Sequence, residues 1–233
     1  MSQKAMVFID GGWLYRNRNV IFSRLGEVGG FEIDYKKMPK ILCEDVANIL
    51  DEDISLVRTC YFGTIPSPRS NFNSAKQVSF YDFLEKGCGY ETEIHEVNLE
   101  TEIPRSDEMW IKVALTSSLL GYASQNSTFD IAILLSDDVE YAPALRQVRK
   151  MGKRVQVVGT HPVADGKNTA PTLFLKSRVN DFPPCYIEDH AEALRLVRET
   201  LKRTCRQCGR EEETTWAGPE FFCSHCRGKH RVN

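Results

Sequence analysis

The segment from Ile131 to Tyr141, IAILLSDDVEY, constrains the fold more than any other part of the sequence. Five consecutive apolar residues are followed at once by acids at Asp137, Asp138 and Glu140, and then by a helical pattern. An uninterrupted apolar run of this length is typical of a strand buried on both faces, as in a parallel sheet. Such a strand carries its acids to the carboxyl edge of the sheet, where open α/β sheets place their functional sites.

Short apolar runs alternate with segments of helical spacing along the rest of the chain. The other expected strands are Met6–Ile9, Ile54–Phe62, Tyr90–Val97, Val155–Val158 and Cys185–Ile187. The expected helices are 13–25, 42–50, 80–87, 106–122, 141–151, 172–178 and 190–201. Strands and helices that alternate in this way form right-handed βαβ units. We therefore predict a three-layer α/β fold with a central, mostly parallel sheet.

The length of 233 residues and the hydrophobic content of 42% allow one sizeable α/β core and a small additional unit. We expect the main domain over 1–188, a connecting helix over 189–202 and a C-terminal unit over 203–233. No apolar run reaches the roughly 18 residues of a membrane span, and the start MSQKAMVFID lacks the layout of a secretory signal. These features predict a cytoplasmic protein without a membrane partner.

The C-terminal unit contains the most specific motif of the chain. Cys205, Cys208, Cys223 and Cys226 form CRQC and CSHC, two pairs separated by fourteen residues. This spacing lets two turns present four thiolates to one Zn²⁺, and four thiolates leave no open position for a substrate. We predict a structural zinc ribbon, with exposed thiols or a redox pair as the alternatives. The other four cysteines are interpreted as ordinary small buried side chains: Cys43, Cys60, Cys88 and Cys185.

The predicted ribbon also combines cations with aromatic residues. These are Arg203, Arg206, Arg210, Arg227, Lys229, Arg231, Trp216, Phe221 and Phe222. Such a surface suits single-stranded nucleic acid, because cations attract phosphates and aromatic rings stack on bases. The same aromatic rings could instead form the small core of the ribbon, and a protein partner could dock there. The formal net charge of −2 means that any nucleic-acid surface must be local.

A second candidate site is the group of acids that follow predicted strands. Asp10 ends the first apolar run before Gly11 and Gly12, Asp138 follows Leu135, and Asp107 lies in the first turn of a predicted helix. Neighbouring strand ends lie about 5 Å apart, so these acids can converge. Carboxylates crowded together need a cation, and hard oxygen ligands suit Mg²⁺ or Mn²⁺. Such an ion supports phosphodiester hydrolysis. The alternative for each single acid is a helix N-cap.

Three stretches of the sequence carry a family resemblance: FIDGGWLYR, RSDEMW and AILLSDDVEYAPALRQVRKMGKRVQVVG. Together they resemble the NYN domain, a branch of the PIN-like nuclease superfamily, over Met6 to Ile187. The resemblance implies a PIN-like fold, a bound divalent metal and endoribonuclease activity. Under it, the metal and catalytic acids fall on Asp10, Asp107, Asp138 and Glu140, and the serine position on Ser136.

Two positions depart from the family pattern. Trp13 stands where the family usually has an asparagine, and Asp137 stands where it usually has a glycine. Loss of the asparagine removes a polar group expected to position a metal-bound water or a phosphate. Asp137 adds a carboxylate, and we include it among the candidate metal ligands. A second acid that many relatives carry in the Asp107 helix has no match near Val113 or Thr116.

Candidate substrate-binding residues are Arg16, Ser136, Arg146 and Lys150. The last two belong to a basic run, Arg146 to Arg154, on the helix after the acidic turn, and would hold phosphates if they face the cleft. A solvated helix face is the alternative.

The leading hypothesis is a Mg²⁺- or Mn²⁺-dependent endoribonuclease with RNA as its partner. The alternative is a catalytically weak or inactive NYN-fold adaptor that binds RNA. The sequence leaves open whether DNA or structured RNA is the substrate, whether a protein partner binds, and whether the chain forms a homo-oligomer.

Overall fold

The computed structural model describes residues 2–23, 32–67, 73–97, 106–161, 179–197, 200–216 and 218–229; the side chains at 22–23, 106–108 and 228–229 lie outside that description. The chain forms two compact units, Met1–Arg195 and Leu196–Asn233. We call them the sheet domain and the four-cysteine unit. The helix expected over 172–178 lies outside the described residues.

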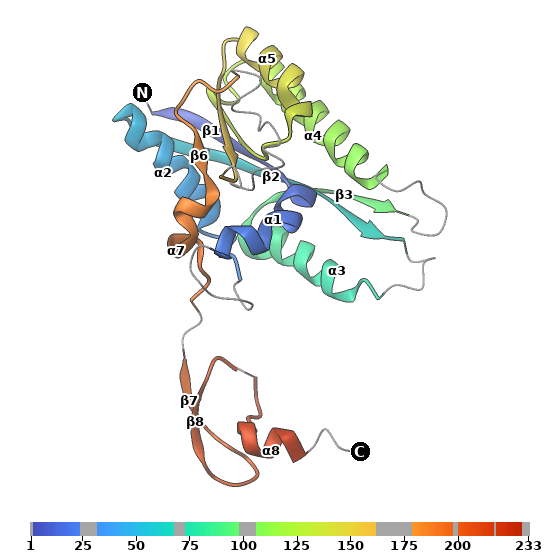
Figure 1. Ribbon diagram of the computed structural model, residues 1–233, viewed down its shortest axis with the longest axis vertical. Coiled ribbons are helices and arrows are strands. Elements are labelled where there is room, and N and C mark those ends of the chain that lie inside the picture. The colour runs from blue at the N-terminus through green and yellow to red at the C-terminus, as the bar shows by residue number, and fades with distance from the viewer. Residues whose placement is uncertain are drawn as a thin grey trace, which may run out of the picture. The chain divides into compact units, whose positions relative to one another are not determined.

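The sheet domain is built on six strands that pair in parallel, in the order β3-β2-β1-β4-β5-β6 (Figure 1). The strands are β1 Gln3–Asp10, β2 Ile54–Pro66, β3 Glu91–Val97, β4 Ile131–Leu135, β5 Arg154–Gly159 and β6 Cys185–Tyr186. This confirms the predicted parallel sheet, with β3 at one edge. The strand order reverses between β1 and β4, because β2 and β3 extend the sheet on one side and β5 and β6 on the other. Open α/β sheets bind ligands at such a switch point.

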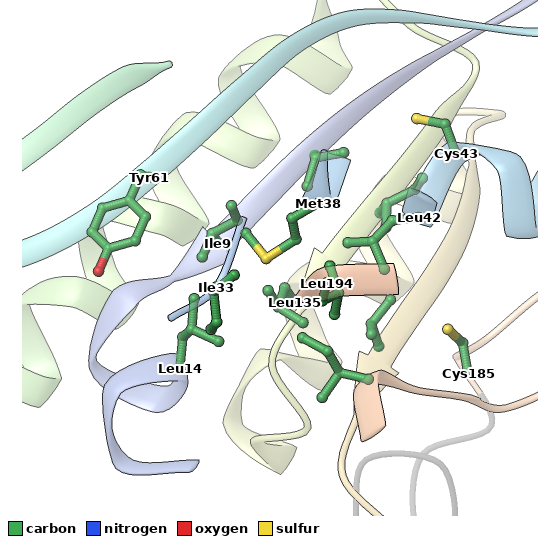
Figure 2. Close-up of a cluster of buried hydrophobic side chains, with 14 of the residues drawn as sticks. Ile9, Leu14, Ile33, Met38, Leu42, Cys43, Tyr61, Leu135, Cys185 and Leu194 are labelled. Atoms are coloured by element: carbon green, nitrogen blue, oxygen red, sulfur yellow. The ribbon is translucent and has the colours of Figure 1, made fainter. Parts of the chain in front are cut away.

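Helices cover both faces of the sheet and complete the three predicted layers (Figure 1). They are α1 Gly11–Ser23, α2 Met38–Leu50, α3 Ala75–Asp82 with a π-helical turn Phe83–Gly87, α4 Ser106–Ser124, α5 Ala142–Lys150 and α7 Ala191–Leu194. Side chains alternate between the two faces along β4: Ile133 and Leu135 face one core, and Leu134 faces the other. Figure 2 shows the first of these cores, which α1, α2 and α7 close. α4 and α5 close the second.

Several element boundaries differ from the predictions: β1 begins at Gln3 instead of Met6, α3 begins at Ala75 instead of residue 80, and two larger differences follow. β2 continues to Pro66 instead of ending at Phe62, because Gly63–Pro66 pairs with the second half of β3. The connecting helix expected over 189–202 is wrong in its extent: a 3-10 turn, η3 Ile187–His190, leads into α7, which ends at Leu194. Arg195 is extended and forms a bridge with Ile33.

The four-cysteine unit contains an antiparallel hairpin of β7 Leu201–Thr204 and β8 Glu211–Thr214, followed by α8 Ser224–Lys229. The sulfur atoms of all four predicted zinc ligands lie within 4.8 Å of one another. Those of Cys208 and Cys223 are 3.6 Å apart, close to the roughly 3.8 Å that a tetrahedral Zn²⁺ with 2.3 Å Zn–S bonds imposes. Phe221 is buried beside the cysteines, whereas Trp216 is exposed. The arrangement is compatible with a zinc ribbon.

Candidate active site

Asp10 is the last residue of β1, next to the switch point of the sheet, and only 2% of its surface is exposed to solvent. Its Oδ1 accepts the backbone N–H of Trp13 at 2.8 Å, and its Oδ2 accepts the hydroxyl of Tyr141 at 2.8 Å. The chain turns into α1 directly afterwards, at Gly11. A Cβ at Gly11 would lie 2.5 Å from the carbonyl oxygen of Phe62, so the turn needs glycine. This turn fixes Asp10 at the carboxyl edge of the sheet.

Burial raises the pKa of Asp10. The Trp13 N–H, the Tyr141 hydroxyl and the positive charge of Arg16 act in the opposite direction, and the negative charge of Asp138 adds to the increase. Burial also raises the pKa of Tyr141, so this residue stays protonated and donates to Asp10. A buried carboxylate beside a second acid is stabilised in its ionised form by a nearby cation.

Asp138 follows β4, the strand next to β1, where Ile9 pairs with Leu135. Its Oδ1 caps the short turn η2 Val139–Tyr141 by accepting the N–H of Glu140 at 3.1 Å. The carboxyl ends of β1 and β4 therefore lie side by side, which brings Asp10 and Asp138 to the same edge of the sheet. Shared metal ligation by these acids stays a prediction. The N-cap alternative also applies to Asp138, because its Oδ1 caps this turn while its Oδ2 pairs with Lys112.

Lys112 of α4 neutralises the acids of this turn, and it was not among the predicted site residues. Its Nζ lies 2.6 Å from Oδ2 of Asp138 and also contacts Glu140. Burial lowers the pKa of Lys112, but hydrogen bonds and charges from the two acids outweigh this effect and raise it. The only signal in the sequence is position: Lys112 lies directly after buried Ile111 on the helix that packs on the sheet.

The two departures from the family pattern contact each other. The indole Nε1–H of buried Trp13 donates to Oδ1 of Asp137 at 2.6 Å. Oδ2 of Asp137 accepts the backbone N–H and the hydroxyl of Thr160, both at 3.2 Å. These contacts link α1, the acidic turn and the end of β5. They favour a structural role for Asp137, whose metal ligation stays a prediction.

Ser136 is fully buried, and its Oγ accepts the N–H of Asp138 at 3.3 Å. It shapes the acidic turn rather than offering a surface to a substrate. Asp107 lies in the first turn of α4, but its side chain is outside the described part of the chain. Among the described side chains, the acids at this edge do not form a three-ligand cluster, so a third ligand depends on Asp107.

A cavity of about 550 Å³ begins directly beside Asp10, at Gly11 and Gly12. Arg16 and Lys76 contribute positive charge to its wall. The rings of Tyr61, Phe80 and Tyr81, which pack against one another, form much of the rest. Of the predicted substrate-binding residues, Arg16 is the one that the fold brings to this cavity.

Arg146 and Lys150 lie elsewhere. α5 starts near the acidic turn and runs back toward Arg154, the first residue of β5, so its last turn lies at the amino edge of the sheet (Figure 1). There the two residues line a hollow of about 520 Å³ in which Arg149 pairs with Asp181 at 2.7 Å. The structure therefore does not bring Lys150 to the acids.

One more buried acid lies at the carboxyl edge and was not predicted. Glu188 is 5% exposed, and its Oε1 accepts the backbone N–H of His161 at 2.9 Å. Its Oε2 has no hydrogen-bond partner among the described residues. A single glutamate in a polar stretch of sequence does not indicate that its side chain will be buried at this edge of the sheet.

The chain forms a doubly wound α/β fold with a parallel sheet and with acids at the switch point of that sheet. The family model of the NYN domain matches residues 4–182, and the chain belongs to this family, a branch of the PIN-like nucleases. Among solved structures, the chain is similar to a protein of unknown function from Vibrio parahaemolyticus, with 16% identity and a TM-score of 0.49, over 84% of this chain and 97% of that one. Comparison with curated proteins gave no match. No helix within the described ranges is long and apolar enough to cross a membrane.

Proposed function

We propose that the protein is a divalent-metal-dependent endoribonuclease that cleaves RNA at the carboxyl edge of β1 and β4. The observation that carries this proposal is the position of Asp10 and Asp138 at the carboxyl ends of adjacent parallel strands, Asp10 as the last residue of β1 and Asp138 in the turn after β4, in a chain of a PIN-like nuclease family. Asp10, Asp138 and Asp107 would hold Mg²⁺ or Mn²⁺, and Glu140 would support them through water. Their oxygen atoms are the ligands that both ions prefer.

When bound, the ion would supply an activated water and neutralise charge on the phosphodiester. The residues of the chain prepare the site. The Trp13 N–H and the Tyr141 hydroxyl fix both oxygens of Asp10. Lys112 balances the charge of Asp138 and Glu140. Once the ion takes over this role, the ammonium of Lys112 would be able to donate to a phosphate oxygen.

The cavity beside Asp10 supports single-stranded RNA as the substrate. Its aromatic wall suits a nucleobase, and Arg16 and Lys76 suit the adjoining phosphates. RNA rather than DNA rests on the family alone. In the four-cysteine unit, we propose a structural Zn²⁺ bound by Cys205, Cys208, Cys223 and Cys226.

The test is cleavage of labelled single-stranded RNA by the full chain with Mn²⁺ and with EDTA. Asp10→Asn and Asp138→Asn should each reduce the rate at least 100-fold. Asp53→Asn is the matched control, because Asp53 is an exposed acid that precedes β2 at the opposite edge of the sheet. Equal rates for the parent and both site variants under the same metal would refute the mechanism.

A second candidate function is an RNA-binding adaptor without turnover. It is favoured by Trp13, which occupies the asparagine position and ties its indole to Asp137. RNA binding that is retained in EDTA, with no Mn²⁺-dependent shortening of the RNA, would support this candidate. Metal-dependent shortening that Asp10→Asn abolishes would exclude it.

A further inference from the structure

Three side chains of types that can bind a metal meet on the face of the sheet domain that α1, α2 and α7 cover. Asp45 lies on α2, Cys185 is the first residue of β6, and His190 is the last residue of η3. One ligand atom from each lies within 4.8 Å of the other two. None of the three was singled out from the sequence as a ligand, because about 140 residues separate Asp45 from the other two.

The distances show that the three groups converge on one point. The Nε2 of His190 lies 3.6 Å from the sulfur of Cys185 and 3.9 Å from Oδ1 of Asp45. A separation of 3.9 Å is too long for a hydrogen bond. A hydrogen-bonded chain can join the same groups, with the His190 Nε2–H donating to the sulfur of Cys185 and the Cys185 thiol donating to Asp45. Such a chain does not require all three ligand atoms to surround one point.

Tetrahedral coordination of a metal does require all three ligand atoms to surround one point. A sulfur 2.3 Å and a nitrogen about 2.05 Å from a tetrahedral Zn²⁺ are about 3.6 Å apart, which matches the Cys185–His190 distance. The corresponding nitrogen–oxygen separation is about 3.4 Å, so Asp45 would need to approach His190 by about half an ångström.

The chemical types of the three ligands and their solvent exposure also fit a zinc site. Thiolate, imidazole and carboxylate together favour Zn²⁺ over Mg²⁺ or Ca²⁺, which take oxygen ligands. Cys185 is 5% exposed, whereas the side chains of His190 and Asp45 are 22% and 29% exposed. The cluster thus has a buried thiol behind two ligands that solvent reaches, which gives an ion a path of entry and room for a water as fourth ligand.

We propose that Asp45, Cys185 and His190 form a zinc site of the sheet domain, distinct from the four-cysteine unit and from the acidic edge. Among the described residues, β6 pairs with β5 at only two positions, Val158 with Cys185 and Gly159 with Tyr186. Zn²⁺ at this point cross-links β6 and η3 to α2. Figure 2 shows Cys185 at the border of the core that contains Cys43, Leu42 and Leu194, where such a link would close the domain.

The test is the zinc content of the full chain, measured by inductively coupled plasma mass spectrometry after dialysis against metal-free buffer. The parent should contain two Zn²⁺ per chain. Cys185→Ser and His190→Gln should each contain one. Cys43→Ser is the matched control, because Cys43 is also 5% exposed and belongs to the same core, and it should keep two.

A second measurement covers the case in which Cys185→Ser fails to fold. The full chain with serine at all four cysteine positions of the C-terminal motif should retain one Zn²⁺, and with Co²⁺ it should show the visible absorption of a tetrahedral site with one thiolate. His190→Gln in that background should abolish this absorption. One Zn²⁺ in the parent, or none in the four-serine variant, would overturn the proposal and leave a hydrogen-bonded cluster. Neither result depends on RNA cleavage.

Discussion

The sheet domain and the four-cysteine unit reach a folded state by different means. The sheet domain buries two apolar layers, one on each face of the sheet. Among its described residues, the four-cysteine unit buries four in its core, three of which are cysteines. The proposed Zn²⁺ would take the place of a larger core there, because so small an apolar core cannot offset the entropy of ordering the chain. Under the two zinc proposals, metal binding is therefore essential in the four-cysteine unit and supplementary in the sheet domain.

The largest expected effect comes from removing zinc from the four-cysteine unit. Cys223→Ser should unfold this unit completely, because Zn²⁺ binding to small zinc domains contributes roughly 10–16 kcal/mol at pH 7. Limited proteolysis should then cut within 201–229 while the sheet domain keeps its melting temperature. Cys88→Ser, at a partly buried cysteine of the sheet domain, is the control. A four-cysteine unit that stays protease-resistant without its metal would break the comparison.

The next effect tests the apolar side of the comparison. Leu134→Ala should lower the free energy of unfolding of the sheet domain by about 2–5 kcal/mol, because Leu134 is fully buried in β4. Urea denaturation measures this change, and the zinc of the four-cysteine unit should be retained. Val113→Ala, at a residue of α4 that is 63% exposed, should change stability by less than about 0.5 kcal/mol. Similar losses for both variants would contradict the assigned core.

A smaller effect concerns the hydrogen bond between Trp13 and Asp137 at the carboxyl edge of the sheet. Trp13→Phe keeps an aromatic ring but removes the N–H that donates to Asp137, and should cost about 1–3 kcal/mol. A double-mutant cycle with Asp137→Ala isolates the contact. Additive effects of the two substitutions would show that the contact contributes nothing.

The smallest effect is a pH dependence at Asp10. Because burial raises the folded-state pKa of Asp10 above its ordinary 3.8, the protein loses stability as the pH rises through the folded pKa and Asp10 ionises. Asp10→Asn removes this loss, since an asparagine can accept from the Trp13 N–H and donate to the Tyr141 hydroxyl oxygen.

The stability of Asp10→Asn relative to the parent should therefore increase from acid to neutral pH. Urea denaturation at several pH values measures this difference. A variant that loses stability relative to the parent as the pH rises would contradict the assigned burial effect.

The sequence predicts the frame of the sheet domain well, because its signals are local. The apolar run Ile131–Leu135 defines β4, and the adjacent acids follow from its end. The prediction of a helix over 190–201 was wrong, because Leu194, Val197 and Leu201 have helical spacing for unrelated reasons. Leu194 is buried in the core, Val197 is 73% exposed, and Leu201 begins a strand that pairs with β8.

Contacts between distant residues could not be predicted. Lys112 reaches Asp138 only once α4 packs on the sheet, and nothing in the local pattern distinguishes it from a solvated lysine. The Trp13–Asp137 contact joins two residues that the sequence shows only as separate departures from a family pattern. Cys185 reads as an ordinary buried cysteine until the fold places His190 and Asp45 beside it.

The proposed function depends above all on a divalent cation held by the acids at the β1–β4 switch point. Anomalous diffraction from a crystal soaked in Mn²⁺ measures this directly. We expect an anomalous peak in contact with carboxylate oxygens of both Asp10 and Asp138, with Lys112 displaced from Asp138. No peak there at saturating Mn²⁺, with Lys112 still bound to Asp138, would show that these acids do not form a metal site.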